Sequence, residues 1–320
     1  MSDNLEIELK LEFAADDEAA AAKLTRGDKF PCLSSDILTT YFDTPDLMFR
    51  NAGFAVRIRS QDGQLVQTVK SPSASVGLFQ RREWDTQLNE HSLDLGALKE
   101  VLGGLVNDAM IGRIVPVFET QFRRLKQEIE TEQTRIERVI DFGEIRVAKT
   151  TLPVSEIELE LLSGRKSGIF DLARSMNRVL PLRIGLHSKA ARGYRLLQRH
   201  APHQATRRPT EWSTDGSNEV DHRSRIASAI YQIRTLESES TGLGDHAAII
   251  RVAELLRELS RHVEFWDVAT NVKENAPSIS RHAKDFANEL QSDGSFCQID
   301  TWQFRDLMLR VTEHLELEGD

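Results

Sequence analysis

Three carboxylates alternate with apolar residues in one short segment, Ser155-Glu-Ile-Glu-Leu-Glu-Leu161. In a β-strand, side chains two residues apart share a face, so Glu156, Glu158 and Glu160 would form one row with a spacing of about 7 Å. Like charges in a row repel one another, whereas an exposed strand usually mixes signs. Glu6 and Glu8 form a similar acidic pair near the start of the chain. Hard divalent cations bind carboxylate oxygens, so these rows predict an acidic wall that holds a metal ion.

Basic side chains follow the same alternation in other segments. Arg57 and Arg59 share a face, Lys70 ends a predicted strand, and Arg81 shares a face with Glu83. One such strand alone is typical of a solvated sheet. If several of these strands line a closed barrel, however, its interior must contain water, because a dry interior could not hold the charges. A basic wall favours a polyanion and an acidic wall a divalent cation, so the set predicts a metal-bound polyphosphate as ligand.

The elements that carry these side chains are mostly strands. Residues 5–13 alternate strictly between apolar and charged, which is the pattern of a strand with one apolar face. Asp62-Gly63 predicts a hairpin turn between two strands. Further strands are predicted at 38–43, 54–60, 64–70, 78–86, 121–130, 134–141, 144–149 and 154–162, and helices at 16–24 and 167–180.

The pattern changes beyond residue 200. Residues 201–217 contain two prolines and a polar run, which predicts a linker between a domain at 1–200 and a helical domain at 218–320. In the second domain apolar residues recur at helical spacing, and its last two helices are predicted at 278–291 and 301–316. We expect its apolar stripes to be buried in a small bundle, on the outside of the first domain, or in a homodimer.

Composition and charge exclude several classes of protein. The 320 residues include 41 Lys and Arg and 50 Asp and Glu, a net charge of -9, which argues against a nucleic-acid-binding protein. Residues 1–217 hold 30 basic and 31 acidic residues, a net of -1, whereas residues 218–320 hold 11 and 19, a net of -8. An anion site is therefore expected in the first part.

The sequence also predicts a cytoplasmic protein without a membrane partner. It contains no apolar run of about 18 residues, the length that a membrane helix needs. No apolar segment of the kind found in secretory signals follows the acidic start. Cys32 and Cys297 lie far apart in the sequence, which is typical of a reducing compartment.

Several blocks of the sequence resemble the CYTH superfamily, also called triphosphate tunnel metalloenzymes. Glu6-Ile-Glu-Leu-Lys10 is similar to its E-x-E-x-K motif. The later blocks follow in order over about residues 4–197. They are Tyr41-Phe-Asp-Thr-Pro-Asp-Leu-Met-Phe-Arg50, Gly53-Phe-Ala-Val-Arg-Ile-Arg59, Gln67-Thr-Val-Lys70, Gln80-Arg-Arg-Glu83, Glu156-Ile-Glu-Leu-Glu160 and Ser188-Lys189. The chain looks most similar to bacterial inorganic triphosphatases with an appended helical domain.

The resemblance implies an α+β fold in which a closed eight-stranded antiparallel barrel with flanking helices precedes a small all-α domain. It also implies a triphosphate or other polyphosphate substrate bound with Mg²⁺ or Mn²⁺. Carried over by position, the substrate-binding residues are Lys10, Arg57, Arg59, Lys70, Arg81, Arg124 and Arg183. The metal ligands are Glu6, Glu8, Glu156, Glu158 and Glu160, and the catalytic residues are Glu158, Glu160 and Lys189.

Two points of register decide which side chains enter the barrel. Arg124 has Arg123 as its neighbour, and a shift of one residue would exchange their faces. Arg82 should point outward, opposite Arg81. Arg192 follows Lys189 and either joins the basic wall or is solvated.

The function expected from the resemblance is hydrolysis of inorganic tripolyphosphate to pyrophosphate and phosphate. One alternative keeps the site but changes the substrate to an organic triphosphate, as in thiamine triphosphatases and class IV adenylate cyclases. Another is a non-catalytic polyphosphate-binding module. The helical part resembles the CHAD domain that often follows CYTH, although it has about half the length of that domain.

Overall fold

The computed structural model describes residues 2–26, 29–72, 78–131, 133–200, 222–239, 246–270, 276–293 and 301–317. The chain forms two compact units. The first comprises Met1–Ser75, Phe79–Ser163 and His187–Glu211, and the second comprises Val76–Leu78, Gly164–Leu186 and Trp212–Asp320. The predicted linker at 201–217 lies outside the described residues.

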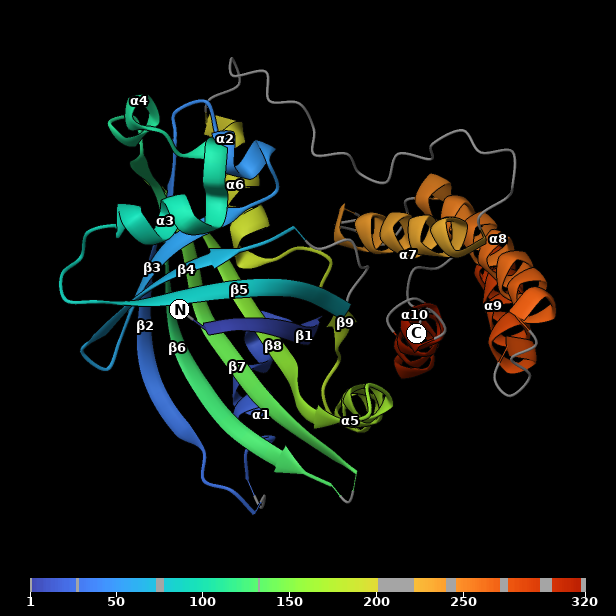
Figure 1. Ribbon diagram of the computed structural model, residues 1–320. Helices are drawn as coiled ribbons and strands as arrows, with labels where there is room; N and C mark the ends of the chain where they lie inside the picture. The colour runs from blue at the N-terminus through green and yellow to red at the C-terminus, as the bar shows by residue number, and fades with distance from the viewer. Residues whose placement is uncertain are drawn as a thin grey trace. The chain divides into compact units, whose positions relative to one another are not determined.

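Eight strands form one closed sheet, in which they curve around a common interior (Figure 1). Their order is β5-β4-β3-β2-β6-β7-β8-β1, and β5 also pairs with β1, which closes the sheet. The strands are β1 (Ser2–Glu12), β2 (Leu33–Asp43), β3 (Ala55–Gln61), β4 (Gln64–Lys70), β5 (Leu78–Leu88), β6 (Val115–Glu130), β7 (Thr134–Val147) and β8 (Thr150–Gly164). Neighbours such as β1 and β8, or β6 and β7, are antiparallel. The predicted closed eight-stranded barrel is confirmed.

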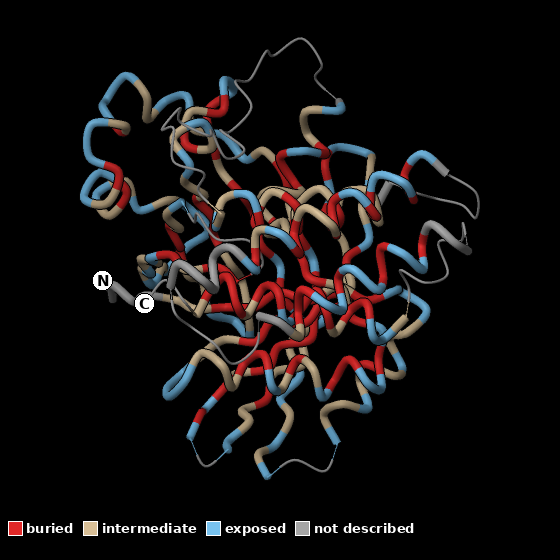
Figure 2. The backbone as a smooth tube through the Cα atoms, turned by 90° about the vertical axis from the view of Figure 1, so that its right-hand side faces the viewer, coloured by how far each residue is buried: buried red, intermediate tan, exposed pale blue. Residues whose placement is uncertain are grey.

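Strand β1 shows how the sequence pattern fits a barrel. Leu9 and Leu11 are fully buried on one face, and Glu8 and Lys10 on the other face are each only 3% exposed. Both faces of the strand are therefore buried, one apolar and one charged. Buried stretches run along the strands throughout the barrel (Figure 2). The charged face is therefore not on the outer surface of the barrel but turned toward its interior. Its side chains must find partners there.

The largest departure from the predicted elements is β7. The segments 134–141 and 144–149 were predicted as two strands, but Thr134–Val147 is one strand. Gly143 lies opposite Phe122 of β6, and a Cβ atom there would be 2.0 Å from the carbonyl oxygen of Gln121. The glycine therefore permits a close approach of two backbones rather than a turn. The predicted turn at Asp62-Gly63 is confirmed, with positive φ angles of 51° and 78°.

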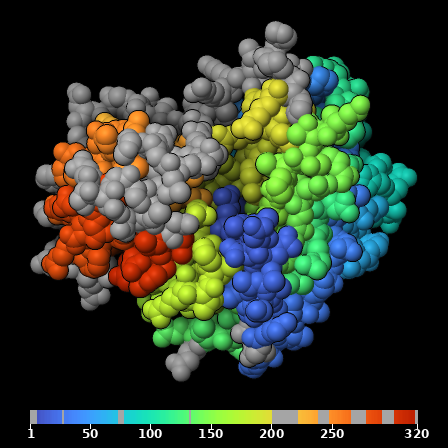
Figure 3. Space-filling model, turned by 180° about the vertical axis from the view of Figure 1, so that it is seen from behind, coloured from blue at the N-terminus to red at the C-terminus, as the bar shows by residue number. Residues whose placement is uncertain are grey.

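Short helices connect or follow the strands of the barrel. They are α1 (Glu18–Lys23), α2 (Met48–Asn51), α3 (Leu95–Leu102), α4 (Asp108–Ile111) and α6 (Lys189–His200), with 3-10 turns at Ala15–Asp17 and Gly103–Leu105. The predicted helix at 16–24 corresponds to the first of these turns followed by α1. Arg138 of β7 donates to the Leu24 carbonyl at 2.7 Å, which fixes the end of this segment on the barrel. Figure 3 shows the blue N-terminal residues beside green and yellow-green residues from the later strands of the barrel.

The second unit contains α5 (Ser167–Asn177), β9 (Arg183–Ile184), α7 (His222–Glu239), α8 (His246–Thr270), α9 (Ala276–Asp293) and α10 (Trp302–Leu317). Helices predicted near 167, 278 and 301 are confirmed, although α5 ends three residues before the predicted end at 180. None of the helices in the described ranges is long and apolar enough to cross a bilayer.

Buried polar contacts explain why α5 groups with the later helices. Arg305 of α10 donates to the Asn177 side chain at 3.0 Å, and Arg174 pairs with Glu313. The compact units therefore place residues 164–186 with the helices, whereas the predicted boundary lies at residue 200. The division into domains at 1–200 and 218–320 stays a prediction.

Candidate functional site

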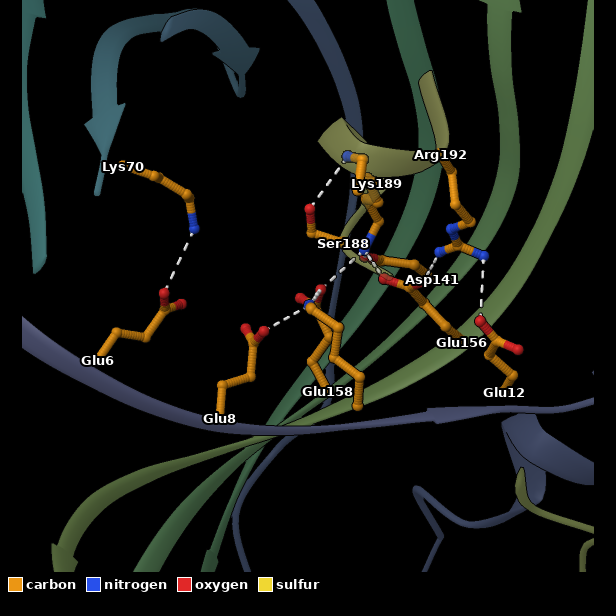
Figure 4. A network of polar contacts seen from close by, with 12 residues as sticks. Glu6, Glu8, Glu12, Lys70, Asp141, Glu156, Glu158, Ser188, Lys189 and Arg192 are labelled. Carbon is orange, nitrogen blue, oxygen red and sulfur yellow. Dashed lines mark hydrogen bonds and ion pairs between the residues drawn. The ribbon is translucent and has the colours of Figure 1, made fainter. Parts of the chain in front are cut away.

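Charged side chains from strands far apart in the sequence meet inside the barrel (Figure 4). β1 and β8 contribute most of the carboxylates, while α6 contributes Lys189 and Arg192 at one end of the network. Ser188 precedes α6, and its hydroxyl accepts from the Ala191 amide at 3.1 Å. This cap fixes the first turn of the helix, from which Lys189 enters the network.

Glu158 lies at the centre of the network. Its carboxylate contacts Lys10 at 2.5 Å, Lys189 at 2.9 Å and Arg124 at 3.2 Å. Burial raises the pKa of Glu158, but the three cations outweigh it and hold the pKa well below its ordinary value. Glu158 is therefore a fully ionised anchor for three basic side chains.

A second group of carboxylates surrounds Lys189 at the α6 end. The Lys189 ammonium is 2.7 Å from Asp141 and also contacts Glu156. Asp141 binds Arg124 through two hydrogen bonds, at 2.8 and 2.6 Å, and Arg192 contacts Glu156. Burial raises the pKa of Asp141, but the neighbouring Arg124 and Lys189 lower it overall. The acidic charge at this end is thus matched by basic charge.

At the other end, Glu6 and Glu83 share two cations. Lys70 is 3.4 Å from Glu6 and also contacts Glu83. The Arg81 guanidinium is 2.9 Å from Glu6 and 3.4 Å from Glu83. Burial raises the pKa of Glu83, but the charges of Lys70, Arg57 and Arg81 lower it overall.

Glu160 differs from the other carboxylates because it has no cationic partner within the described part of the chain. Burial raises its pKa to about 7, helped by the charges of Glu6, Glu137 and Glu8. Glu8 and Glu160 also face each other across the β1–β8 pair. Glu160 is therefore the carboxylate of this group whose charge is not matched by a described cation, whereas Glu6, Glu8 and Glu137 each contact one.

One group of carboxylates in the described part of the chain has its ligand atoms close together. Those of Asp141, Glu156 and Glu158 lie within 4.8 Å of one another, but the Lys189 ammonium already contacts all three. Glu160 has no described cationic partner, although its neighbours Glu6 and Glu8 contact Lys70, Arg81 and Lys10. Carboxylate oxygens are the donors that Mg²⁺ and Mn²⁺ prefer, so Glu160 is the predicted ligand that is open to a cation.

Arg57 and Arg59 are the basic counterpart of Glu160. The Nε atoms of both are buried without a hydrogen-bond partner in the structure. Burial, together with the charges of Arg57 and Arg124, lowers the pKa of Arg59 to about 9. The Tyr41 hydroxyl oxygen accepts a hydrogen bond from the Arg57 guanidinium. A bound anion would supply both the missing hydrogen bonds and the missing charge.

The structure brings most of the predicted site residues together in the barrel. Ion pairs join Glu6, Glu8, Glu156, Glu158, Lys189, Lys10, Lys70, Arg81 and Arg124. Among the described residues no ion pair involves Glu160 of β8 or Arg57 and Arg59 of β3. Arg183 belongs to the second unit, and its role stays a prediction. Arg82 and Arg123 are exposed, as alternation from Arg81 and Arg124 predicts. The side chain of Arg123 instead lies over the Phe142 ring at 5.1 Å.

Sequence reasoning did not assign Glu83 and Asp141 to the site. A signal was present, since Glu83 shares a face with Arg81 and Asp141 lies four residues after Glu137 in the same strand. Arg192 was expected either to join the basic wall or to be solvated; it joins the network through an ion pair with Glu156. Tyr41 carried no charge pattern, so only its position beside Arg57 in the fold identifies it.

Comparison with known proteins identifies the family. Residues 4–194 match the model of the CYTH domain, so the chain belongs to the CYTH domain family. An inorganic triphosphatase from Haemophilus influenzae is 33% identical over 160 residues, which cover 49% of this chain and 45% of that protein. The chain therefore matches about half the length of this curated relative.

Two solved structures resemble the chain more distantly. One is a putative adenylyl cyclase from Hippeastrum, described as having a dominant triphosphatase activity, with 19% identity and a TM-score of 0.45. The alignment covers 59% of this chain and 95% of that one. The other is a putative adenylate cyclase from Bacillus halodurans, with 19% identity, a TM-score of 0.40 and coverage of 60% and 98%.

Proposed function

We propose that this protein hydrolyses inorganic tripolyphosphate to pyrophosphate and phosphate inside the barrel, with Mg²⁺ or Mn²⁺ as cofactor. The observation that carries the proposal is the pair of unmet charge requirements within one interior. Arg57 and Arg59 have buried nitrogens without partners, and Glu160 lacks a cation. A metal-bound polyanion meets both requirements at once. Membership of the CYTH domain family and the similarity to an inorganic triphosphatase support the same substrate class.

The basic residues bind and orient the substrate. Arg57 and Arg59 would hold phosphate oxygens as hydrogen-bonding forks, and Lys70 would act as a point charge beside them. These contacts keep the chain of phosphates extended along the barrel, so that the bond to be broken has a fixed position.

Glu160, together with Glu6 and Glu8, would hold the divalent cation, which would compete with the present contacts of Glu6 and Glu8 to Lys70, Arg81 and Lys10. When bound, the cation would offset charge on the phosphate oxygens and make the phosphorus more electrophilic. Glu156 was also predicted as a ligand, but in the structure it contacts Lys189 and Arg192. We therefore assign Glu156 to holding these two basic side chains.

Lys189 and Glu158 would act on the reacting groups from the α6 end. Glu158 holds Lys189 in place, and its lowered pKa makes it a poor proton acceptor. Lys189 is therefore the better candidate for stabilising negative charge on the leaving group or for orienting the attacking water.

Phosphate release from tripolyphosphate tests the proposal. We expect turnover with Mg²⁺ or Mn²⁺ and its loss in excess EDTA, with recovery when the cation is restored. A parallel panel with ATP and thiamine triphosphate distinguishes inorganic from organic triphosphates. Full activity in EDTA would overturn the metal requirement, and a higher kcat/KM for an organic triphosphate would overturn the substrate. Tight tripolyphosphate binding without phosphate release would instead indicate a binding module.

A further inference from the structure

Helix α6 approaches the barrel unusually closely at Gly193. A Cβ atom on this residue would lie 2.2 Å from the Phe118 ring of β6, far inside normal contact distance. Phe118 is 4% exposed and belongs to a packed core, so its ring has little room to move. Only glycine therefore allows α6 to lie this close to β6. Lys189 lies one turn before Gly193 in the same helix, so this close approach also sets the position of Lys189.

Asp43 fixes the same helix with a buried hydrogen-bond network. Its carboxylate is fully buried and accepts from the amides of Thr44, Phe49 and Arg50 at 2.8, 2.9 and 3.0 Å. It also accepts from the Tyr194 hydroxyl at 2.9 Å. Asp43 thus joins the end of β2, the start of α2 and the middle of α6 at one point. Burial raises the pKa of this carboxyl, and the donors compensate in part.

An aromatic column connects this point with the substrate-binding wall. The Tyr194 ring meets Phe118 edge-on with centroids 5.1 Å apart, and Phe118 stacks on Tyr41 at 4.5 Å. The Tyr41 hydroxyl contacts Arg57. The position of α6 and the position of the basic wall are therefore set by one continuous group of packed side chains.

We propose that Asp43 and Tyr194 are positioning residues that act through Lys189. Their hydrogen bond holds α6 at the depth allowed by Gly193, so that the Lys189 ammonium reaches Asp141 and Glu158. The inference rests on the proposed triphosphatase function, because its kinetic consequence is a loss of turnover. Loss of this hydrogen bond alone leaves the rings of Tyr194, Phe118 and Tyr41 in place beside Arg57 of β3, so substrate binding is affected less than turnover.

Tyr194→Phe is the sharpest variant because it removes the hydrogen bond to Asp43 and keeps the ring against Phe118. In the full chain we expect kcat for tripolyphosphate to fall about ten- to a hundredfold, with KM changed less than about threefold. The same substitution in a Lys189→Met background should lower kcat by less than about twofold, because the residue through which it acts is already gone. Equal losses in the two backgrounds would overturn the proposal.

Hydrogen exchange provides a measurement that does not depend on activity. Tyr194→Phe should speed amide exchange in α6 peptides and leave β3–β4 peptides unchanged. Gly193→Ala should have the same effect through steric displacement. Tyr231→Phe in α7 removes a tyrosine hydroxyl outside the first unit and serves as matched control. If the wild type does not hydrolyse tripolyphosphate, the proposed function fails and the exchange result alone decides. Unchanged α6 exchange in both variants would then overturn the positioning role.

Discussion

Glu158 and Glu160 are two residues apart on one strand, yet their surroundings have opposite charge. Three cations contact Glu158 and lower its pKa, whereas burial and nearby carboxylates raise the pKa of Glu160 to about 7. Environments that separate the pKa values of two carboxyls also separate their tasks. Glu158 holds three basic side chains in place, and Glu160 is the carboxyl that a bound cation would neutralise.

Substitution of the two carboxyls should therefore have different consequences. Glu160→Gln relieves repulsion, so the metal-free melting temperature should stay the same or rise, while metal-dependent turnover falls at least about 100-fold. Glu158→Gln leaves three buried cations short of a partner and should lower stability, by about 3 to 5 kcal/mol for a fully broken buried pair. Melting curves and steady-state kinetics measure both. A Glu160→Gln variant that folds and turns over normally would contradict the assignment.

The raised pKa of Glu160 also predicts a pH dependence of stability. The folded-state pKa is about 7, and the ordinary value is 4.5, so the folded protein binds the proton more tightly than the unfolded chain. The protonated Glu160 carboxyl therefore adds to the free energy of unfolding. This contribution is fully present below pH 4.5 and is lost as the pH rises to about 7. In EDTA, the wild type should therefore lose stability between about pH 5 and 7 relative to Glu160→Gln. Chemical denaturation of both proteins across this range tests the difference, and identical pH profiles would argue against it.

Arg81 and Arg82 provide a test of strand register at the residue scale. Arg81 is buried and contacts Glu6, whereas Arg82 is exposed. Arg81→Ala should raise the KM for tripolyphosphate strongly, and Arg82→Ala should leave it within about twofold, because a solvated charge outside the barrel contributes little to binding. Steady-state kinetics of the two variants decide the question. Equal effects would show that the faces of β5 have been misassigned.

At the scale of elements, alternation of charged and apolar residues predicted most of the barrel. It worked because each strand has two different faces, and Arg57 and Arg59, for example, could share one face only in a strand. It did not predict α6, whose residues Lys189 and Arg192 carry charge at helical spacing without a long apolar stripe. The ion pair of Asp141 with Lys189 could not be predicted either, because it joins a strand and a helix that are distant in sequence.

Gly143 is another residue whose role depends on a neighbouring strand and not on the local sequence pattern, and its substitution can be tested. Two strands were predicted on either side of Gly143, at 134–141 and 144–149, but the glycine lies within one strand and allows β6 and β7 to approach each other. Gly143→Ala should lower the free energy of unfolding by at least about 2 kcal/mol, because the added methyl group meets backbone atoms that cannot move aside. Urea denaturation measures the change. Gly112→Ala is the matched control, since a Cβ there has no heavy atom within 4 Å and should alter stability by less than about 0.5 kcal/mol.

At the scale of the whole molecule, the proposed active-site residues and the excess of negative charge lie in different parts of the chain. The contacts that join the charged side chains of the barrel all lie in the first unit, while residues 218–320 carry a net charge of -8. Such an acidic segment would repel a triphosphate, so it is a poor surface for collecting substrate. The helices nevertheless bury apolar stripes of their own, including Ile226, Leu255 and Leu259. Their packing gives the second unit a core that is independent of the barrel network.

We therefore expect the helices after residue 205 to be dispensable for turnover. A truncated chain of residues 1–205 retains every described side chain of the ion-pair network, so its kcat should stay within about tenfold of the full chain, or 1.4 kcal/mol. Stability and solubility should fall, because α5 normally packs against α10 and its Asn177 loses Arg305. Kinetics at equal concentrations of folded protein, checked by circular dichroism and gel filtration, provide the comparison. A larger loss of kcat in a folded truncation would show that the helical unit contributes to the active site, because the remaining barrel already contains all the charges that the proposed reaction needs.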